Sequence, residues 1–346
     1  MISDAGVFTY DYDDVNRLTD LTNHKGEVFS FNYDVNNRLK EMMRPGSKTS
    51  FDFDATSFIN HITHTKINTN LITFLEYSRD AVGNRTQIRG PASDVTYNYD
   101  NNNQLTGVHS NVTGSESFGY DSLGNRMTDH VGNYIYDEQY QRLKEDFKYL
   151  YVYDDNGNLA SKIDKANQAD FEQYIHRSDN RLIQIKKFVG GVLTQESNYT
   201  YDALNRRVEK QVIDYNDANN NVTKRFVYDG NEAHIETDES NSITAIYTHS
   251  TLRTDDMLAV DVTSHGVSKK RAQSQGSYFY LKDAQGTVTD LTDTNGNIIQ
   301  HYDYFSFGKI AKVTNGLGVD ISTNPQVEPY FTYTGREYDS ESGYYY

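Results

Sequence analysis

Aromatic and polar side chains alternate along many short segments of the chain. In VFSFNYD, which begins at Val28, the rings of Phe29, Phe31 and Tyr33 occupy every second position. A period of two residues is typical of β-strands whose two faces have different surroundings. No sustained stripe of apolar residues at helical spacing is present, and we expect at most a turn or two of helix, near Asp255 to Leu258.

One phrase recurs along the chain: an aromatic residue and an aspartate, then turn residues, then arginine or leucine. YDSLGNRMT is one copy, and YDALNRRVE is another. The copies begin at Tyr12, Tyr33, Phe53, Tyr77, Tyr99, Tyr120, Tyr136, Tyr153, Tyr201 and Tyr228, with a weak copy, HRSDNRLIQIKK, near His176. A period of roughly twenty residues indicates an array of small units, in which each unit packs against its neighbours.

Each copy of the phrase predicts a β-hairpin. In YDSLGNRMT the carboxylate of Asp121 can accept backbone N–H groups, and the pair Gly124 and Asn125 tolerates the positive φ of a tight turn. Arg126 begins the returning strand, where we expect an ion pair with Asp121. A single hairpin is marginally stable, so the hairpins must join into a continuous sheet. Turns are predicted at Asp121–Asn125, Asp154–Asn158 and Asn295–Asn297.

The composition favours a thin wall over a thick core. Apolar residues make up 36% of the chain and the mean hydropathy is -0.77, whereas 29 tyrosines and 16 phenylalanines are present. Aromatic rings bury a large area, and the tyrosine hydroxyl can stay in contact with water. We therefore expect a sheet that is wet on both faces and is held by cross-strand aromatic and Tyr–Arg pairs.

Charge and cysteine content exclude several classes of function. The formal charge of -16 is unfavourable for binding DNA, RNA or an anionic membrane. The chain has no cysteine, which excludes disulfides and thiolate metal sites. No stretch has the roughly 20 apolar residues of a membrane-spanning helix, and the first residues do not resemble a signal peptide.

The residues that could act as catalytic groups or metal ligands are better explained by structural roles in strands and turns. His301, Asp303 and Asp293 could form an acid–base cluster, but TDTNGNIIQHYDY has the pattern strand, turn, strand. His61 and His64 are separated by an odd number of positions, which places them on opposite faces of a strand, as solvated side chains. DTNGN and DDNGN resemble the start of a calcium loop but lack its later ligands.

The sequence also lacks the usual catalytic motifs. No phosphate-binding loop, nucleophile elbow or zinc-protease helix is present. N-x-[ST] triplets are interpreted as accidents of an asparagine-rich chain; they begin at Asn84, Asn111, Asn198 and Asn221. We therefore predict a protein that is not an enzyme, with no catalytic, cofactor-binding or metal-binding residues.

The repeated Tyr-Asp phrases resemble those of the Rhs, or YD-repeat, family, which is related to the Tc toxin C components, the bacterial wall-associated proteins and the shell of the teneurins. YFYLKDAQGTVTDLTDTNGNIIQHYDYFSFGK, from Tyr278 to Lys309, is similar to the opening of the Rhs-associated core, and GREYDSESGYYY is similar to its closing motif. The residues that match these motifs are Tyr278, Asp283, Gly286, Gly296, Tyr302, Tyr304, Gly308, Gly335, Arg336, Glu337, Tyr338, Asp339, Glu341, Gly343, Tyr344 and Tyr345.

The resemblance implies an all-β fold, in which antiparallel hairpin repeats form a spiralling shell or part of one. It divides the chain into a YD-repeat array, residues 1–246, and an Rhs-associated core, residues 247–346. The function implied is a structural shell of a polymorphic toxin, secreted or at the cell surface as part of a longer protein. Its partners would be a C-terminal toxin cargo or other shell segments. The alternative is an adhesion module that recognises glycans or proteins, as in the teneurins.

The family usually continues beyond the three tyrosines, with a self-cleavage stretch and a variable toxin, which this chain lacks. We expect either a truncated parent or a degenerate gene. The closing segment, which we define as Gly335–Tyr346, carries more aromatic surface than a free tail keeps in water. We therefore predict that it folds against the shell as a plug or seam element.

Overall fold

The computed structural model describes residues 2–3, 6–68, 70–91, 93–263, 275–328 and 330–346. Antiparallel strands joined by short turns form nearly all of this part of the chain, and it contains no α-helix. The short 3-10 turns are η1 (Ala218–Asn220) and η3 (Tyr333–Gly335). Within the same residues, no helix has the length and apolar character needed to span a membrane.

The hairpins follow one another edge to edge in two large sheets rather than in one. The 12-stranded sheet consists of β3 (Thr9–Tyr12), β4 (Leu18–Thr22), β5 (Val28–Tyr33), β6 (Leu39–Arg44), β7 (Ser47–Phe53), β8 (Ile59–Lys66), β9 (Leu71–Arg79), β10 (Arg85–Arg89), β11 (Asp94–Tyr99), β12 (Leu105–Ser110), β13 (Gly114–Tyr120) and β14 (Arg126–Asp129). An isolated bridge between Thr128 and Asn133 leads on toward the second sheet.

The 16-stranded sheet consists of β15 (Ile135–Tyr136), β16 (Leu143–Glu145), β17 (Tyr149–Tyr153), β18 (Leu159–Asp164), β19 (Phe171–His176), β20 (Leu182–Val189), β21 (Val192–Tyr201), β22 (Arg207–Asp214), β23 (Val222–Asp229), β24 (Glu232–Thr237), β25 (Ile243–His249), β26 (Met257–Val262), β27 (Gly276–Lys282), β28 (Val288–Thr292), β29 (Ile298–Tyr304) and β30 (Ile310–Asn315). Two small ladders pair β1 (Ile2–Ser3) with β2 (Gly6–Val7), and β31 (Tyr338–Asp339) with β32 (Tyr344–Tyr345).

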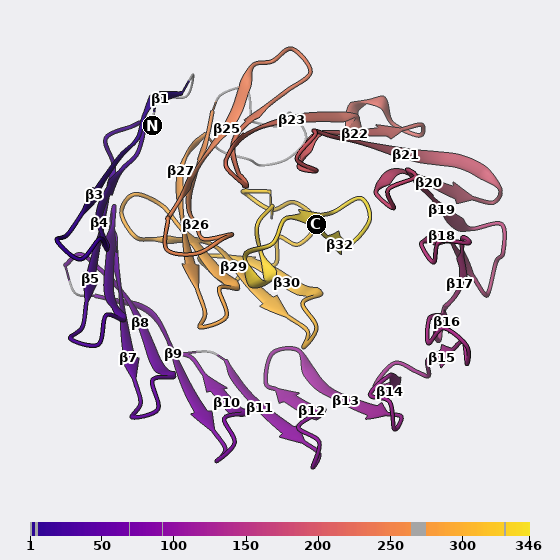
Figure 1. The fold of residues 1–346 in the computed structure, drawn as a ribbon, viewed down its shortest axis with the longest axis horizontal. Helices are drawn as coiled ribbons and strands as arrows, with labels where there is room; N and C mark the ends of the chain where they lie inside the picture. The colour runs from indigo at the N-terminus through magenta and orange to yellow at the C-terminus, as the bar shows by residue number, and fades with distance from the viewer. Residues whose placement is uncertain (1, 4–5, 69, 92, 264–274, 329) are drawn as a thin grey trace.

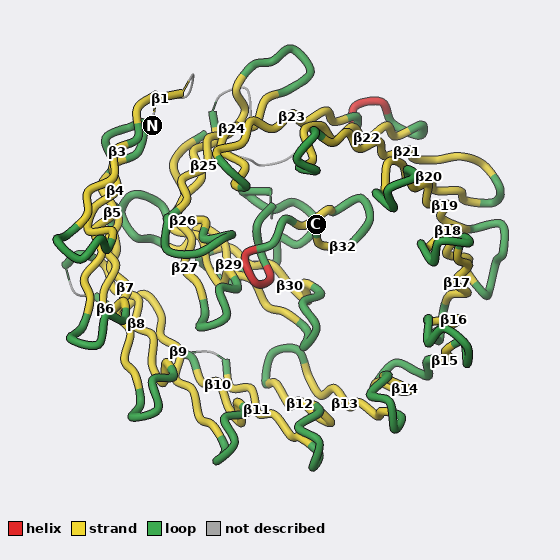
Figure 2. The backbone as a smooth tube through the Cα atoms, in the orientation of Figure 1, coloured by secondary structure: helices red, strands yellow, loops and turns green. Residues whose placement is uncertain are grey.

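The sheets curve into an inward spiral. Figure 1 shows the first sheet and the strands β15–β23 as an outer turn, after which β25–β30 pass inside the first strands. The C-terminal end lies near the centre of the view, and Figure 2 shows the same path with strands connected by loops. This arrangement confirms the expected all-β fold of antiparallel hairpins.

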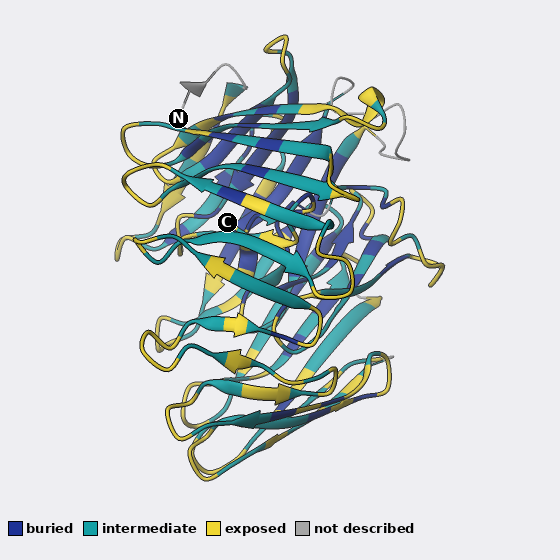
Figure 3. Ribbon diagram, turned by 90° about the vertical axis from the view of Figure 1, so that its right-hand side faces the viewer, coloured by how far each residue is buried: buried dark blue, intermediate teal, exposed yellow. Residues whose placement is uncertain are grey.

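The inner strands pack directly on the outer ones, which produces a two-layer wall. Leu21, Phe29 and Phe31 of the outer layer pack against Leu258 and Phe279 of the inner layer in one buried cluster. Polar contacts join the same layers at intervals: Lys25 with Asp261, Arg44 with the carbonyl of Tyr280, Tyr77 with the amide of Ala284, and Glu116 with Ser306. Figure 3 shows buried residues concentrated on part of the strands and exposed residues at many of the turns.

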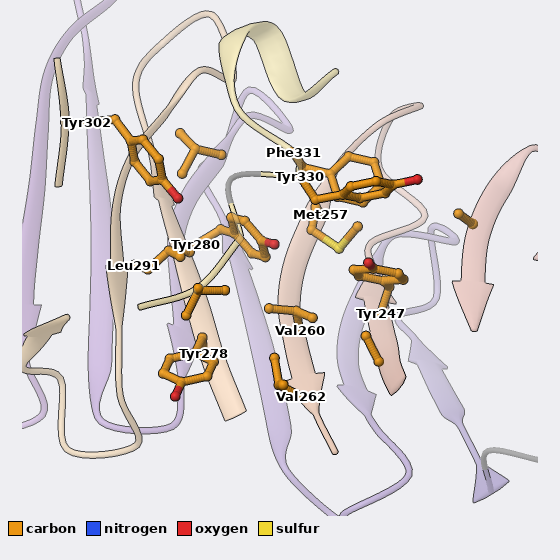
Figure 4. Close-up of a cluster of buried hydrophobic side chains, with 14 of the residues drawn as sticks. Tyr247, Met257, Val260, Val262, Tyr278, Tyr280, Leu291, Tyr302, Tyr330 and Phe331 are labelled. Atoms are coloured by element: carbon orange, nitrogen blue, oxygen red, sulfur yellow. The ribbon is translucent and has the colours of Figure 1, made fainter. Parts of the chain in front are cut away.

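The expectation of a uniformly thin wall was therefore wrong. A larger core, which includes Met257, Val260, Tyr280 and Leu291, lies among the inner strands and the residues that follow them (Figure 4). The composition could not reveal this core, because it forms where the residues after β30 fold back onto the inner strands.

The repeated aspartate forms the turns as predicted. The Oδ1 atom of Asp121 accepts the backbone N–H groups of Leu123 and Asn125, at 2.9 and 2.8 Å. Gly124 has a φ of +87°, a conformation that glycine and asparagine tolerate best. The turns at Asp154–Asn158 and Asp293–Asn297 have the same pattern of backbone hydrogen bonds.

The expected ion pair between Asp121 and Arg126 was wrong. Asn125, the fourth residue after the aspartate, donates to Asp121 instead, at 2.9 Å. The guanidinium of Arg126 lies over the rings of Tyr134 and Phe307, 4.7 and 4.6 Å from their centroids. In several other copies the fourth residue is arginine, and it pairs with the aspartate: Arg17 with Asp13, Arg38 with Asp34, and Arg206 with Asp202.

In six copies the same fourth residue also links its turn to the next one along the rim. Its side chain bonds the following turn in the pairs Arg17–Asn37, Arg38–Ser57, Asn84–Asn103, Asn125–Gln141, Asn158–Asn180 and Arg206–Gly230. The repeat tyrosine donates its hydroxyl to a carbonyl of the preceding unit in the pairs Tyr33–Leu18, Tyr99–Arg85, Tyr120–Leu105, Tyr153–Leu143, Tyr201–Leu182, Tyr228–Arg207 and Tyr304–Val288. The phrase therefore both forms a hairpin and joins it to its neighbour.

Two further expectations concern residues 246–258. The turn of helix near Asp255 to Leu258 is absent, because Asp255 has a φ of +59° and β26 begins at Met257. The division between residues 246 and 247 falls inside β25, and the sheet continues across it. The division into array and core stays a prediction.

Candidate functional site at the closing segment

The closing segment lies inside the spiral, where charged side chains of the wall hold it. Arg207 of β22 donates two hydrogen bonds to Asp339, at 2.6 and 2.9 Å, and also pairs with Glu337. Lys210 of the same strand binds Asp339 at 2.8 Å and Glu341 at 3.2 Å. We call these five residues the anchor. All five side chains are buried, with Arg207 only 1% exposed.

Local geometry explains why the anchor residues face one another. Glu337 and Asp339 are separated by one residue, so the extended backbone at β31 presents them on one side, and Glu341 follows in the turn before β32. Arg207 and Lys210 are three positions apart and would face opposite sides of a regular strand. In the pairing of β21 with β22, Tyr201 lies opposite Arg207 and Thr200 lies opposite Glu209, so Val208 is an extra residue in β22. This bulge at Val208 brings both cations to the inner face.

The anchor charges change one another's ionisation. Burial by itself raises the pKa of Asp339, but Arg207 and Lys210 hold that pKa below its ordinary value. Burial lowers the pKa of Arg207, whereas Asp339 more than offsets this effect and leaves the guanidinium firmly charged. Each buried charge therefore has an opposite partner, which is the condition for tolerating it away from water.

Residues just before the closing segment pack by aromatic stacking. The ring of Tyr330 lies nearly parallel to those of Phe226 and Tyr247, with centroids 5.6 and 6.0 Å away (Figure 4 labels Tyr247 and Tyr330). The hydroxyl of Tyr330 donates to Glu337 of the anchor. Lys224 of β23 approaches the same ring at 4.8 Å while binding Glu328 at 2.8 Å and Glu236 at 3.0 Å.

The last tyrosines complete the attachment. Tyr345 donates its hydroxyl to the carbonyl of Gly308 at 2.7 Å, and its ring packs against Tyr338. The hydroxyl of Tyr346 accepts the backbone N–H of Arg207 at 3.0 Å, while its ring lies 4.3 Å from that guanidinium. Tyr344 remains 42% exposed. The segment folds against the sheet, as expected from its aromatic residues.

The residues of the family motif occupy several different places. Glu337, Asp339 and Glu341 belong to the anchor, and Arg336 instead pairs with Asp255 at 3.1 Å. Tyr278 and Tyr302 lie in the large core. Tyr304, the last residue of β29, packs against that core. The remaining members lie at turns or in the closing segment: Asp283, Gly286, Gly296, Gly308, Gly335, Tyr338, Gly343, Tyr344 and Tyr345. The structure does not bring the motif together as one constellation.

Gly308 and Gly335 show why two of the motif positions are glycine. Both have a positive φ, of +89° and +78°. A β-carbon at Gly308 would lie 2.5 Å from the ring of Tyr333, and one at Gly335 would lie 2.6 Å from the carbonyl oxygen of Asp255. The backbone at Gly308 therefore lies close to the ring of Tyr333, and the backbone at Gly335 lies close to the backbone of Asp255.

The histidine and aspartate candidates are part of the sheet. His301 of β29 lies between Asp290 at 2.8 Å and Asp303 at 3.4 Å, whereas Asp293 belongs to the adjoining turn. Burial opposes the charge on His301, but the two carboxylates raise its pKa to about 10. The imidazole is therefore protonated near neutral pH and forms an ion pair across the sheet.

The other candidates likewise have structural contacts. His61 is half-buried, but His64 is only 1% exposed, so the expectation of two solvated histidines was wrong for His64. Burial lowers the pKa of His64 to about 3. The Oδ1 atoms of Asp154 and Asp293, in DDNGN and DTNGN, accept backbone N–H groups of their own turns.

Sequence reasoning missed both cations of the anchor. In YDALNRRVEK, Arg206 takes the usual place in the repeat and pairs with Asp202, whereas Arg207 is an additional arginine. That extra charge at the start of a strand was the available signal. The bulge that turns Lys210 inward recurs at the second residue of the returning strand in other copies of the phrase, as at Thr19, Lys40 and Ala160, so it is a feature of the repeat.

Hairpins that spiral inward and hold the chain's own closing segment define a shell of the YD-repeat class. The profile of the teneurin YD-shell matches residues 66–343. The chain therefore belongs to this family and to the wider group of Rhs and YD-repeat proteins. Its fold is that of a structural shell.

Similar curated proteins are much longer than this chain. The tRNA3(Ser)-specific nuclease WapA of Bacillus spizizenii is 28% identical over 280 residues, which cover 79% of this chain and 9% of that protein. The double-stranded DNA deaminase toxin A of Burkholderia cenocepacia is 24% identical over 280 residues, which cover 72% and 19%. The chain thus corresponds to a small part of each relative.

Solved structures share the fold. The Photorhabdus luminescens Tc holotoxin pore matches with a TM-score of 0.70 at 16% identity, over 99% of this chain and 19% of that chain. The complex of TcdB2 with TccC3 matches with a TM-score of 0.59 at 14% identity, over 98% and 20%. At this level of identity the likeness establishes the fold alone.

Proposed function

We propose that this chain is a non-catalytic part of a shell that encloses a polypeptide joined to its C-terminal end. The observation that carries this proposal is the position of the anchor, which holds the closing segment inside the spiral through buried ion pairs. A chain that continues from Tyr346 starts from the inner side of the wall. Relatives named as a nuclease and as a deaminase toxin are compatible with an enclosed enzyme as cargo.

The anchor also gives the proposed division of the chain a role. Arg207 and Lys210 lie in the proposed array, residues 1–246, and Asp339 and Glu341 lie in the proposed core, residues 247–346. The core would then bring the cargo attachment point to the array. In a longer parent, other shell segments would be further partners, and we infer that the parent acts outside the producing cell or at its surface.

A fusion experiment tests enclosure. A short unstructured peptide with a single protease site is joined either after Tyr346 or before Met1 of the full chain. We expect the peptide after Tyr346 to be cut more slowly, because the wall restricts access to it. Asp339→Asn should remove this protection. Asp320→Asn, the same change at an exposed turn, should leave the protection intact.

Equal cleavage at the two ends would contradict enclosure. It would favour the alternative, a recognition module that acts through its outer surface, which the teneurin relationship suggests. A hydrolytic or deaminase activity of the purified chain, abolished by changing one of its residues, would contradict the non-catalytic part of the proposal.

A further inference from the structure

A cavity lies between the two layers of the wall, away from the anchor. Its volume is about 240 Å³. Outer strands β6–β8 contribute most of the apolar lining, and the inner layer adds Leu258 and charged side chains near the turn after β27. The apolar lining residues are Leu39, Met42, Phe51, Phe53, Ile59, Leu252 and Leu258.

Arg44 provides a buried positive charge in this cavity. Its Nη1 atom donates to the carbonyl of Tyr280 at 2.7 Å, and its Nη2 atom donates to the hydroxyl of Thr49 at 2.6 Å. The Nε atom is buried and has no hydrogen-bond partner. Among the residues that the structure describes, no carboxylate forms an ion pair with Arg44, which is only 3% exposed.

The neighbouring groups compensate this charge only in part, because the carboxylate that acts on Arg44, that of Asp256, forms its ion pairs with other cations. The hydroxyl of Thr49 accepts the hydrogen bond of Arg44 and in turn donates to Nδ1 of His64, at 2.8 Å. Neither of these two partners carries a negative charge. On the other side, Asp256 is shared between Lys282 at 2.9 Å and Arg253 at 3.2 Å.

The charges that line the cavity therefore sum to a net positive value. Arg44, Arg253 and Lys282 are three cations, and Asp256 and Asp283 are two carboxylates, which leaves one positive charge in excess. The Asp283 carboxylate accepts the backbone N–H groups of Gln285 and Thr287, at 2.8 and 2.9 Å, so it is already occupied. A buried charge without an opposite partner is costly, and an anion would relieve that cost.

We propose that this cavity binds a small carboxylic acid with an apolar tail. The carboxylate would lie at Arg44, whose planar guanidinium favours that shape, and the tail would contact the apolar side chains of β6–β8. Inorganic phosphate fits less well, because most of the lining offers it no hydrogen bond. The volume is below the roughly 300–1,000 Å³ of pockets for drug-sized ligands, which favours a short tail.

Calorimetry on the full chain with hexanoate and with hexanol tests the proposal. The two probes share the tail and differ in charge. We expect hexanoate to bind roughly tenfold or more tightly than hexanol, as for a hydrogen bond to a charged group. Equal affinity would show an apolar cavity without an anion site, and absence of binding by hexanoate would also overturn the proposal. Phenylacetate in place of hexanoate distinguishes an aromatic from an aliphatic ligand.

Two variants locate the binding. Ile59→Trp fills the cavity from the outer layer and should abolish hexanoate binding, whereas Ile67→Trp, an exposed position beyond the same strand, should not. Arg44→Met keeps an unbranched side chain as far as the position of Nε but removes the guanidinium charge, and should reduce the affinity for hexanoate to that for hexanol. Arg89→Met, at an exposed arginine, is its control. Hexanoate binding that survives Ile59→Trp with unchanged affinity would place the ligand elsewhere and refute the assignment.

Discussion

Two parts of the wall contain the same kind of hairpin but bury their side chains to different extents. In β26 of the two-layer wall, all six residues from Met257 to Val262 are buried. In β18, on the single-layer part of the outer turn, every residue from Leu159 to Asp164 is only partly buried. The repeat therefore specifies the hairpin, whereas the neighbouring layer decides how much apolar surface is buried.

The two parts consequently depend on different interactions. In the two-layer wall, Phe29 and Phe279 meet across the layers, with centroids 5.9 Å apart. In the single layer, stability comes from pairs along the sheet, such as Phe171 stacked on Phe188 at 4.3 Å, and from links between successive turns. Such pairs contribute roughly 0.2–1 kcal/mol each, so many are needed.

The largest expected effect is in the two-layer wall. Phe279→Ala should lower the free energy of unfolding by about 3–5 kcal/mol, because it leaves a cavity between packed layers. Phe171→Ala in the single layer is the matched control and should cost about 1 kcal/mol. Equilibrium unfolding in urea measures both. Similar losses for the two variants would contradict the distinction between the parts.

A second variant tests how the single-layer wall holds the closing segment. Asp339→Asn leaves Arg207 and Lys210 with less compensation, and should cost about 3 kcal/mol. Limited digestion with trypsin should then cut faster after Arg336, an exposed side chain. Asp320→Asn is the control for the charge change. If cleavage after Arg336 is already rapid in the unchanged chain, the segment is not held as described.

Acid should weaken the same attachment. Because the folded pKa of Asp339 is below its unfolded value, its carboxylate stabilises the fold above about pH 4. This contribution is lost as the pH falls through the folded pKa. The stability difference between the unchanged chain and Asp339→Asn should therefore shrink below about pH 4. A difference that stays constant to low pH would exclude Asp339 as its source.

The smallest expected effect concerns a single turn. Asp121→Ala removes the acceptor of two backbone N–H groups and should cost about 1 kcal/mol. Ser122→Ala, at the adjacent exposed position, should change stability by less than about 0.5 kcal/mol. A loss of binding or catalysis without a loss of thermal stability would show that Asp121 has a functional role instead.

Sequence patterns predicted the hairpins well because the interactions that form them are local. In most copies the aspartate bonds N–H groups two and four residues later, as Asp121 does, and the alternation of Phe29 with Phe31 places both rings in the core. Such contacts depend only on neighbours in the chain. The hairpin array could therefore be predicted from the alternation and the repeated phrase, whereas the packing of the closing segment was expected because its aromatic surface needs cover.

The rest was decided by contacts between distant residues. The bulge at Val208 is shared by other copies of the phrase, but the carboxylates that Arg207 and Lys210 meet lie more than a hundred positions away in the sequence. The two-layer wall likewise depends on pairs such as Lys25 with Asp261 and Glu116 with Ser306. A repeat specifies how one hairpin joins the next, but it does not specify where the spiral meets itself. That meeting depends on the accumulated curvature of many strands, which only the tertiary structure contains.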